Sequence, residues 1–305
     1  MERVVQDFEW QTSELSDQGG RTFVVTGASS GVGLEVAKAL LVANGTVIAG
    51  VRNPAKMSSL IPGRGSGGAG RLVVRAVDLA DLRSIDAFAA GLERDGFVLD
   101  ALVNNAGVTT SSFETSPEGI ELTFATNLIG PARLTEKLLP LLTAADPRIV
   151  LVASNLSQRT TKEPDLTAVG DPSSFSQFGT YRASKIAAAA YAADLGRRLA
   201  EEGSRVRSVI AHPGVAATGM ATQADNPVTK TIARLITSRI ARPASDSARS
   251  VIWSATSPDI EQGVFVGPDL KRRKTGLRVA RVRGAAADPA FQARVSRFVH
   301  ELTPA

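Results

Sequence analysis

Short apolar segments alternate along this chain with longer segments of helical periodicity, and no other feature constrains the fold as strongly. Alternating strands and helices form a parallel sheet with helices on both faces, because each connection between parallel strands crosses one face of the sheet. The expected strands lie near residues 21–26, 46–51, 72–77, 99–104, 148–153, 205–211 and 263–266. The expected helices lie near residues 32–43, 82–94, 117–143, 177–202 and 245–256. The sequence therefore predicts an α/β protein with a doubly wound parallel sheet of about seven strands.

A glycine-rich turn joins the first expected strand to the first expected helix. It reads Thr26-Gly27-Ala28-Ser29-Ser30-Gly31-Val32-Gly33. Glycines let a backbone approach a pyrophosphate, and the free N–H groups of a helix N-terminus bind its charge. The spacing Gly-x-x-x-Gly-x-Gly differs from the common Gly-x-Gly-x-x-Gly fingerprint, and an ordinary strand–turn–helix connection could also carry it. The strand before the turn and the helix after it favour a dinucleotide site in a single Rossmann-like domain.

Tyr181 and Lys185 lie four residues apart in the expected helix 177–202, so their side chains share one face. A free tyrosine has a pKa near 10 and is a poor acid–base catalyst at neutral pH, whereas an adjacent ammonium favours the phenolate. Lowering the pKa by about 3 units requires about 4 kcal/mol, which one close charge in a partly desolvated cleft can supply. A Tyr-x-x-x-Lys spacing is also common on helices, so the pair alone does not establish catalysis.

Together with four further motifs in the same order, these features resemble the short-chain dehydrogenase/reductase family, in its compact single-domain branch. The further motifs are Asn104-Asn105-Ala106-Gly107 after the fourth strand, Asn127 in the next long helix, Ser154 at the end of the fifth strand, and Pro213-Gly214 after the sixth. The resemblance covers about residues 21–267. The chain is most similar to the retinol dehydrogenase and protochlorophyllide reductase branch, on the basis of Trp10, Asp17, Val51-Arg52-Asn53 and His212-Pro213-Gly214-Val215.

The resemblance implies a catalytic set of Asn127, Ser154, Tyr181 and Lys185. Tyr181 would be the general acid in carbonyl reduction and the base in alcohol oxidation. Lys185 would lower its pKa and hold the nicotinamide ribose, and Ser154 would donate a hydrogen bond to the substrate oxygen. Asn127 would hold a water that links Lys185 to solvent. From the residues alone, Asn127 could equally mark a helix kink before Gly130-Pro131, and Ser154 could be a strand-end cap.

The expected cofactor is NADP(H), because Val51 stands where NAD-preferring enzymes have a carboxylate and Arg52 follows it. A guanidinium there could pair with a 2′-phosphate, although Arg52 could also be a plain surface cation. Asp78 would contact the adenine amine. The expected cofactor-binding residues are Gly27, Ser29, Ser30, Gly31, Val32, Gly33, Arg52, Asn53, Asp78, Leu79, Asn105, Ala106, Gly107, Tyr181, Lys185, Pro213, Gly214, Val215 and Thr218.

Two long polar segments, 155–176 and 216–243, follow the carboxyl ends of strands, where open α/β sheets bind ligands. We expect them to be substrate loops, the second with a helix over about 227–240, although they could be surface insertions. Five apolar residues could form a pocket and favour a hydrophobic ketone, aldehyde or secondary alcohol as substrate, or they simply pack. These residues are Leu156, Phe175, Phe178, Met220 and Leu235.

The catalytic domain is expected over 21–267, between an N-terminal extension (1–20) and a basic C-terminal extension (268–305). Asp288-Pro289 is typical of a helix start and predicts a last helix to about Leu302. The net charge is +5, and much of the excess lies in 271–283. That run could bind nucleic acid or anionic lipid, but no stacking aromatics interleave it, so a solvated strand or loop is favoured and no nucleic-acid partner is expected.

Composition limits which membrane, disulfide and metal-binding features the chain can have. No stretch approaches 18 apolar residues, and the polar N-terminus is unlike a secretory signal, so no membrane span and a cytoplasmic location are expected. Zero cysteines exclude disulfides, and two isolated histidines disfavour a metal site. The alanine-rich run 187–193 suggests a homodimer or homotetramer interface, although packing against the sheet would also explain it. A catalytically idle, dinucleotide-sensing regulator and a basic nucleic-acid-binding protein are the alternative functions.

Overall fold

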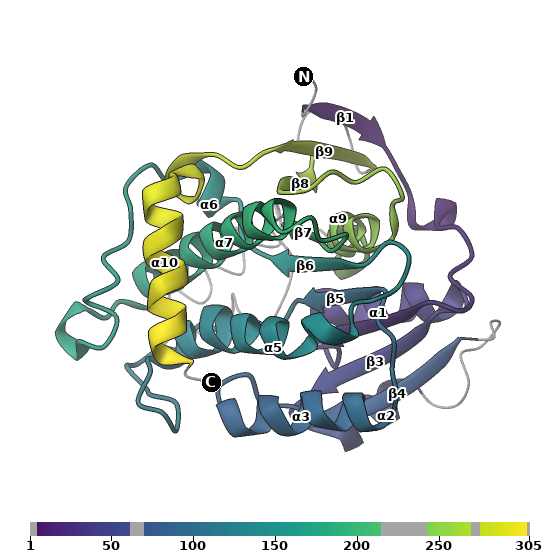
Figure 1. The fold of residues 1–305 in the computed structure, drawn as a ribbon, viewed down its shortest axis with the longest axis horizontal. Coiled ribbons are helices and arrows are strands. Elements are labelled where there is room, and N and C mark those ends of the chain that lie inside the picture. The colour runs from purple at the N-terminus through teal and green to yellow at the C-terminus, as the bar shows by residue number, and fades with distance from the viewer. Residues whose placement is uncertain (1–4, 62–69, 215–242, 270–274, 304–305) are drawn as a thin grey trace.

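The protein forms one nine-stranded sheet in the order β1-β9-β8-β7-β6-β5-β2-β3-β4 (Figure 1). The structure, a computed structural model, describes residues 5–61, 70–214, 243–269 and 275–303. Seven strands run parallel: β2 (Thr22–Thr26), β3 (Thr46–Val51), β4 (Arg71–Ala76), β5 (Ala101–Asn104), β6 (Arg148–Val152), β7 (Arg207–Ala211) and β8 (Val264–Pro268). These are the seven strands predicted from the sequence, and the doubly wound α/β fold is confirmed.

Two further strands extend the sheet beyond the predicted set. β9 (Gly276–Arg281) pairs antiparallel with β8, and β1 (Gln6–Glu9) pairs antiparallel with β9. Arg278 on β9 forms two hydrogen bonds to the Asp7 carboxylate on β1, at 2.6 and 2.7 Å. Of the solvated strand or loop expected for the basic run, 276–281 is a strand; its basic side chains Arg278 and Arg281 are not buried, whereas Leu277 and Val279 are. The sheet therefore continues past residue 267.

The helices divide between the two faces of the sheet. α1 (Gly31–Val42) and α9 (Ala244–Thr256) cover one face, and α3 (Leu82–Arg94), α5 (Gly130–Leu138) and α7 (Gln177–Glu201) cover the other. Because side chains alternate along a strand, Val24 of β2 belongs to the α7 side of the core and its neighbour Val25 to the α1 side. α10 (Pro289–Leu302) lies across one end of α7 (Figure 1).

Several smaller elements complete the described ranges. The short helices are α2 (Pro54–Leu60), α4 (Leu122–Phe124) and α6 (Leu156–Arg159). The 3₁₀ turns are η1 (Thr12–Glu14), η3 (Leu139–Leu141), η4 (Pro172–Ser174) and η6 (Gly284–Ala287), and η2 (Ala125–Ile129) is a π-helical turn. The long helix predicted over 117–143 is confirmed over 122–141, where α4, η2, α5 and η3 follow one another without a gap and η2 introduces a π-helical turn. The helix predicted over 227–240 lies outside the described residues.

The C-terminal helix begins as the sequence predicts. Asp288 is its N-cap and accepts a hydrogen bond from the Phe291 amide at 2.9 Å, and Pro289 occupies the first helical position. Phe291, Val295 and Val299 are buried, and they belong to the same core cluster as α7. On α7, Ala187–Ala190 have no exposed surface within this single chain. Their small side chains pack inside this chain, and the predicted homodimer or homotetramer interface stays a prediction.

Candidate functional site

The predicted site residues gather where the strand order reverses. β2 and β5 are neighbours in the sheet although β3 and β4 separate them in sequence, and ligands of open α/β sheets bind outside the carboxyl ends at such a point. Thr26, the last residue of β2, joins the two strand ends. Its Oγ1 accepts hydrogen bonds from the amides of Asn105 (3.0 Å) and Ala106 (3.1 Å). Asn105 Nδ2 in turn donates to the Thr26 carbonyl at 2.8 Å.

The glycine-rich turn packs tightly against this junction. A Cβ at Gly27 would lie 2.9 Å from Ala106 Cα, and one at Gly33 would lie 2.3 Å from Asn105 Nδ2. Gly27 and Gly31 also have positive φ values of 66° and 52°, which other residues rarely adopt. Ser30 precedes α1, and no side chain caps the first turn of this helix. Its amide groups and the positive end of its dipole are therefore available to an anion.

Gly107, Asn127 and Lys185 come together beside β6. Lys185 Nζ donates a hydrogen bond to the Val152 carbonyl at 2.9 Å. A Cβ at Gly107 would lie 3.1 Å from both Lys185 Nζ and Asn127 Oδ1, so the lysine reaches this position past a residue without a side chain. Asn127 lies within the π-helical turn, a feature that is frequent at functional sites. Three of the predicted residues, from three separate segments, thus share one small volume.

The Asn127 side chain bridges two of these segments. Its Oδ1 accepts the Val108 amide hydrogen at 2.8 Å, and its Nδ2 donates to the Val108 carbonyl and to Ser184 Oγ, each at 3.0 Å. Ser184 Oγ donates to the Tyr181 carbonyl at 2.8 Å. The motif comparison did not single out Ser184, although its position three residues after Tyr181 places it on a neighbouring part of the helix surface.

Burial sets the protonation of the Tyr–Lys pair. Lys185 is only 4% exposed, and this desolvation lowers its pKa to about 8. Tyr181 is half-buried, and burial raises the pKa of its phenol. Burial therefore acts on the Tyr181 pKa in the direction opposite to the lowering expected from Lys185. The physical reason is that burial disfavours the phenolate while the Lys185 ammonium is engaged with the Val152 carbonyl.

Ser154 follows two residues after the carbonyl that holds Lys185. It is half-buried, and its Oγ accepts a hydrogen bond from the Leu156 amide at 3.3 Å. Its carbonyl accepts from Ser157 Oγ at 2.6 Å at the start of α6. Ser154 thus stabilises the turn between β6 and α6, two residues after the strand ends, where one interpretation of the sequence had a strand-end cap. A hydroxyl that accepts still has its own proton, so Ser154 can also donate to another oxygen.

The residues predicted for the adenosine side follow β3 and β4. Arg52 is exposed directly after β3, and no described residue forms an ion pair with it. Asn53 Oδ1 accepts the Lys56 amide hydrogen at 3.1 Å and thereby caps α2. Asp78 Oδ1 accepts the Ala80 amide hydrogen at 3.0 Å, and Leu79 is buried. Asn53 and Asp78 therefore have local structural partners, whereas Arg52 has a free guanidinium among the described residues.

The last predicted motif follows β7. Gly214 has a positive φ of 78°, and a Cβ there would lie 3.0 Å from Pro268 Cγ. Its amide donates to His212 Nδ1 at 3.1 Å, a contact that the sequence motif did not indicate. Val215 and Thr218 lie outside the described residues, as do residues 216–242 of the second expected substrate loop.

Apolar side chains lie near the start of α7. Phe113 and Phe175 contact edge to face, with ring centroids 6.2 Å apart. Phe178, three residues before Tyr181, is 63% exposed, the largest exposure of an aromatic side chain among the described residues. Leu156 is half-buried on α6. Met220 and Leu235 lie outside the described residues.

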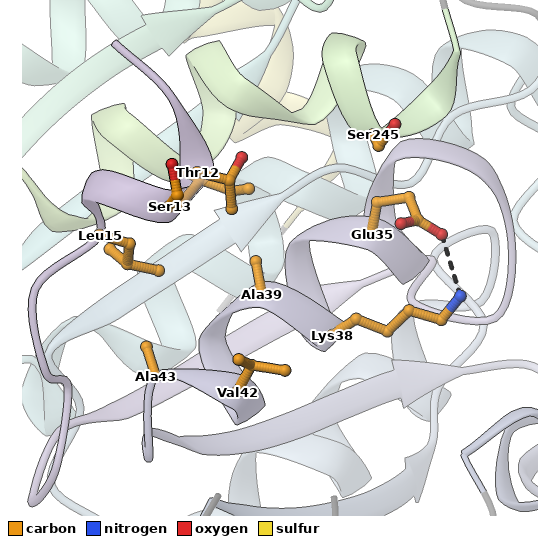
Figure 2. A pocket seen from close by; sticks show the side chains of 10 residues that line it. Thr12, Ser13, Leu15, Glu35, Lys38, Ala39, Val42, Ala43 and Ser245 are labelled. Atoms are coloured by element: carbon orange, nitrogen blue, oxygen red, sulfur yellow. Dashed lines mark hydrogen bonds and ion pairs between the residues drawn. The ribbon is translucent and has the colours of Figure 1, made fainter. Parts of the chain in front are cut away.

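Two hollows lie elsewhere on the described surface. The first, of about 410 Å³, lies between η1, α1 and the start of α9. Figure 2 shows Leu15, Ala39 and Val42 along it, with an ion pair of 3.0 Å between Glu35 and Lys38 on one side. The second, of about 560 Å³, lies between α10 and residues 118–121 and 166–170. None of the predicted catalytic residues lines either hollow.

Within the described ranges, none of the helices combines the length and apolar character needed to cross a bilayer. The same part of the chain contains no group of three or more Asp, Glu and His side chains placed to hold a metal ion.

The chain is similar in sequence to known dehydrogenases. A family model described as short chain dehydrogenase matches residues 21–228. Retinol dehydrogenase 14 of Homo sapiens is 31% identical over 258 residues, which cover 79% of this chain and 76% of the relative. Polyprenol dehydrogenase of Mus musculus is 30% identical over 253 residues, or 81% of this chain and 75% of the relative.

Solved structures show the same fold. An uncharacterised protein from Mycobacterium paratuberculosis superposes with a TM-score of 0.79 at 30% identity and covers 97% of each chain. A short-chain dehydrogenase from Shigella flexneri, solved in complex with NADP, superposes with a TM-score of 0.63 at 20% identity, over 82% of this chain and 96% of its own.

Proposed function

Because the chain belongs to the short-chain dehydrogenase family, we propose that it is an NADP(H)-dependent oxidoreductase that interconverts a carbonyl and an alcohol on a hydrophobic small molecule. The observation that carries this proposal is the buried Lys185 beside Gly107 and Asn127, one helical turn from Tyr181. Burying an ammonium costs free energy, so its position at this sheet edge, where a backbone carbonyl accepts its hydrogen bond, favours a functional role.

The residues present fit a phosphorylated dinucleotide. The uncapped first turn of α1 supplies amide donors and a positive dipole end for a pyrophosphate. The exposed Arg52 guanidinium, at the end of β3, suits a 2′-phosphate. Such a cofactor would supply or accept the hydride at the substrate carbon. Asn53 would contribute from the N-terminus of α2, which it caps, and Asp78 from the turn in which it accepts the Ala80 amide hydrogen.

In this proposal Tyr181 transfers the proton, and Lys185 lowers the pKa of the Tyr181 phenol. Tyr181 donates its phenolic proton to the carbonyl oxygen in reduction and takes it back in oxidation. Because burial alone raises the pKa of Tyr181, the required lowering must come from the Lys185 ammonium once its hydrogen bonding rearranges. The Lys185 pKa of about 8 keeps that ammonium mostly charged at neutral pH.

Ser154 and Asn127 have separate supporting roles beside Tyr181 and Lys185. Ser154 donates its free hydroxyl proton to the substrate oxygen, the preorganised-donor effect. Asn127 uses both amide hydrogens and one oxygen lone pair within the chain, so its side chain has one acceptor position left for a water. We therefore propose that Asn127 chiefly fixes Val108 and α7 around Lys185, with the proton-relay water as an additional role.

A hydrophobic substrate is supported by the aromatic side chains near Tyr181 and by two relatives. Phe178 is exposed one helical turn before Tyr181, and the Phe113–Phe175 pair lies close to the start of the same helix. Retinol and polyprenol, which name the two relatives, are apolar alcohols. The oligomeric state and the cytoplasmic location stay predictions.

Two measurements test the function. NADPH and NADH are first titrated by fluorescence, and we expect tighter binding of NADPH. A panel of long-chain and aromatic aldehydes, ketones and alcohols is then screened by absorbance of the reduced nicotinamide. Turnover of apolar members supports the proposal. Tight NADPH binding without turnover of any member would instead support the dinucleotide-sensing regulator, and the absence of dinucleotide binding would contradict both.

A further inference from the structure

His212 is the first residue after β7, and neighbouring elements hold it on several sides. Its amide donates to the Val266 carbonyl of β8 at 2.8 Å. Its carbonyl accepts a hydrogen bond from Ser250 Oγ of α9 at 2.7 Å. The imidazole ring lies 5.2 Å from the Phe265 ring at an angle of 31°, and the residue is 7% exposed. Backbone and ring are therefore both fixed in place.

Residue 267 must be glycine for this ring position to exist. A Cβ at Gly267 would lie 2.0 Å from His212 Nε2 and 2.1 Å from its Cδ2. Non-bonded heavy atoms do not approach so closely, so a side chain at position 267 would displace the imidazole. The His212 ring thus occupies the space that a side chain at position 267 of β8 would fill.

The ring in this position holds the turn that follows. His212 Nδ1 accepts the Gly214 amide hydrogen at 3.1 Å, while Gly214 has the left-handed φ of 78°. Pro213 has no amide hydrogen, so Gly214 carries the first free donor after His212. Glycine alone adopts positive and negative φ about equally, so the hydrogen bond selects one conformation. Burial also lowers the His212 pKa to about 4, which keeps Nδ1 available as an acceptor at neutral pH.

We propose that His212 is a positioning residue for the dinucleotide site: its Nδ1 fixes the Pro213-Gly214 turn in the conformation that lines the cofactor. This inference rests on the proposed function, because the turn has a cofactor to line only if the chain binds one. It adds a residue to the site that acts through its neighbour and touches neither cofactor nor substrate.

A matched pair of substitutions separates this role from simple packing. His212→Asn and His212→Leu both remove the ring contact with Phe265. Asparagine can place its Oδ1 near the position of Nδ1 and accept the Gly214 amide hydrogen, whereas leucine cannot. His300→Leu is the control, because His300 is the other histidine of the chain and lies exposed on α10.

Hydrogen exchange of the Gly214 amide is measured in the cofactor-free proteins, and the Kd for NADPH is measured by titration. In His212→Leu we expect exchange at least about tenfold faster and a Kd at least about tenfold higher, because the part-buried Gly214 amide loses its hydrogen-bond acceptor. His212→Asn should recover most of both losses, and His300→Leu should match the wild type.

Equal values for His212→Asn and His212→Leu in either measurement would overturn the inference. Failure of the wild type to bind any dinucleotide would refute the proposed function and the positioning role together. In that case slow Gly214 exchange in the wild type and fast exchange in His212→Leu would identify the contact as purely structural.

Discussion

At the residue scale, the proposed preference for NADP(H) depends on Arg52. Arg52 is exposed, directly follows β3 and has no ion-pair partner among the described residues, whereas Asn53 beside it is engaged in capping α2. The sequence predicted Arg52 from its position after the second parallel strand, and the structure shows that strand ending at Val51. The pKa values of Tyr181 and Lys185 were beyond such prediction, because they depend on burial, which neither motif nor spacing encodes.

Arg52→Ala should weaken NADPH binding by about ten- to a hundredfold and leave NADH binding nearly unchanged. The lost contact is a charge-assisted hydrogen bond, worth about 1.5–3 kcal/mol in a partly exposed position. Titration of both cofactors measures the effect. Arg205→Ala is the control, since Arg205 is exposed just before β7 and therefore lies at the opposite edge of the sheet. An equal effect of Arg52→Ala on both cofactors would make Arg52 a plain surface cation.

His212 should make folding stability depend on pH. Burial, with a smaller contribution from the Arg159 charge, lowers its pKa from 6.5 to about 4. Between these values the unfolded chain binds a proton that the folded chain does not, so the free energy of unfolding falls as pH decreases through this window. From pH 7 to pH 5 this contribution is about 2 kcal/mol. Urea unfolding of wild type and His212→Asn at both pH values isolates it, and an identical pH response of the two proteins would contradict it.

At the scale of elements, the junctions between strands and helices explain what the sequence could and could not predict. The parallel strands and the start of α10 follow from local patterns, namely apolar runs and the Asp288-Pro289 cap. The helix predicted over 117–143 contains a π-helical turn at Asn127, whose side chain bridges Val108 and Ser184 on other segments. A π-helical turn fixed by such distant partners leaves no periodic signal in the sequence.

Thr26→Val should disrupt the junction of β2 and β5. It removes the fully buried Oγ1 that accepts the amides of Asn105 and Ala106, while side-chain volume is nearly unchanged. Leaving these two part-buried donors without their acceptor should cost about 1–3 kcal/mol in the free energy of unfolding, measured by urea denaturation. Thr22→Val on the same strand should be nearly neutral, because Thr22 is only half-buried. Equal effects of the two substitutions would contradict the proposed junction.

The whole molecule uses both ends of the chain to complete the sheet and core. β1 and β9 extend the sheet, and α10 covers part of α7 (Figure 1). The sequence did not predict β1, because its pairing with β9 joins residues about 270 positions apart through Asp7 and Arg278. The alanine-rich run of α7 illustrates the same difficulty, since small side chains are equally suited to a partner chain and to this chain's own core.

Phe291→Ala should lower the free energy of unfolding by about 3–5 kcal/mol, because it leaves a cavity where α10 meets the α7 side of the core. Thermal or urea denaturation measures the loss. Ala290→Ser, at an exposed neighbouring position on α10, is the control and should change stability little. A small effect of Phe291→Ala would mean that α10 is a loosely attached extension.

The most direct test of the central claim is turnover by Tyr181→Phe on whichever apolar carbonyl or alcohol the wild type converts. This substitution removes only the phenolic hydroxyl from the half-buried ring. Oxidation or reduction of the nicotinamide is followed by absorbance, with the NADPH Kd measured on the same preparation. We expect the NADPH Kd within about twofold of the wild type and a loss of turnover of at least about a hundredfold. Wild-type turnover by Tyr181→Phe would contradict the assignment of Tyr181 as the acid–base residue.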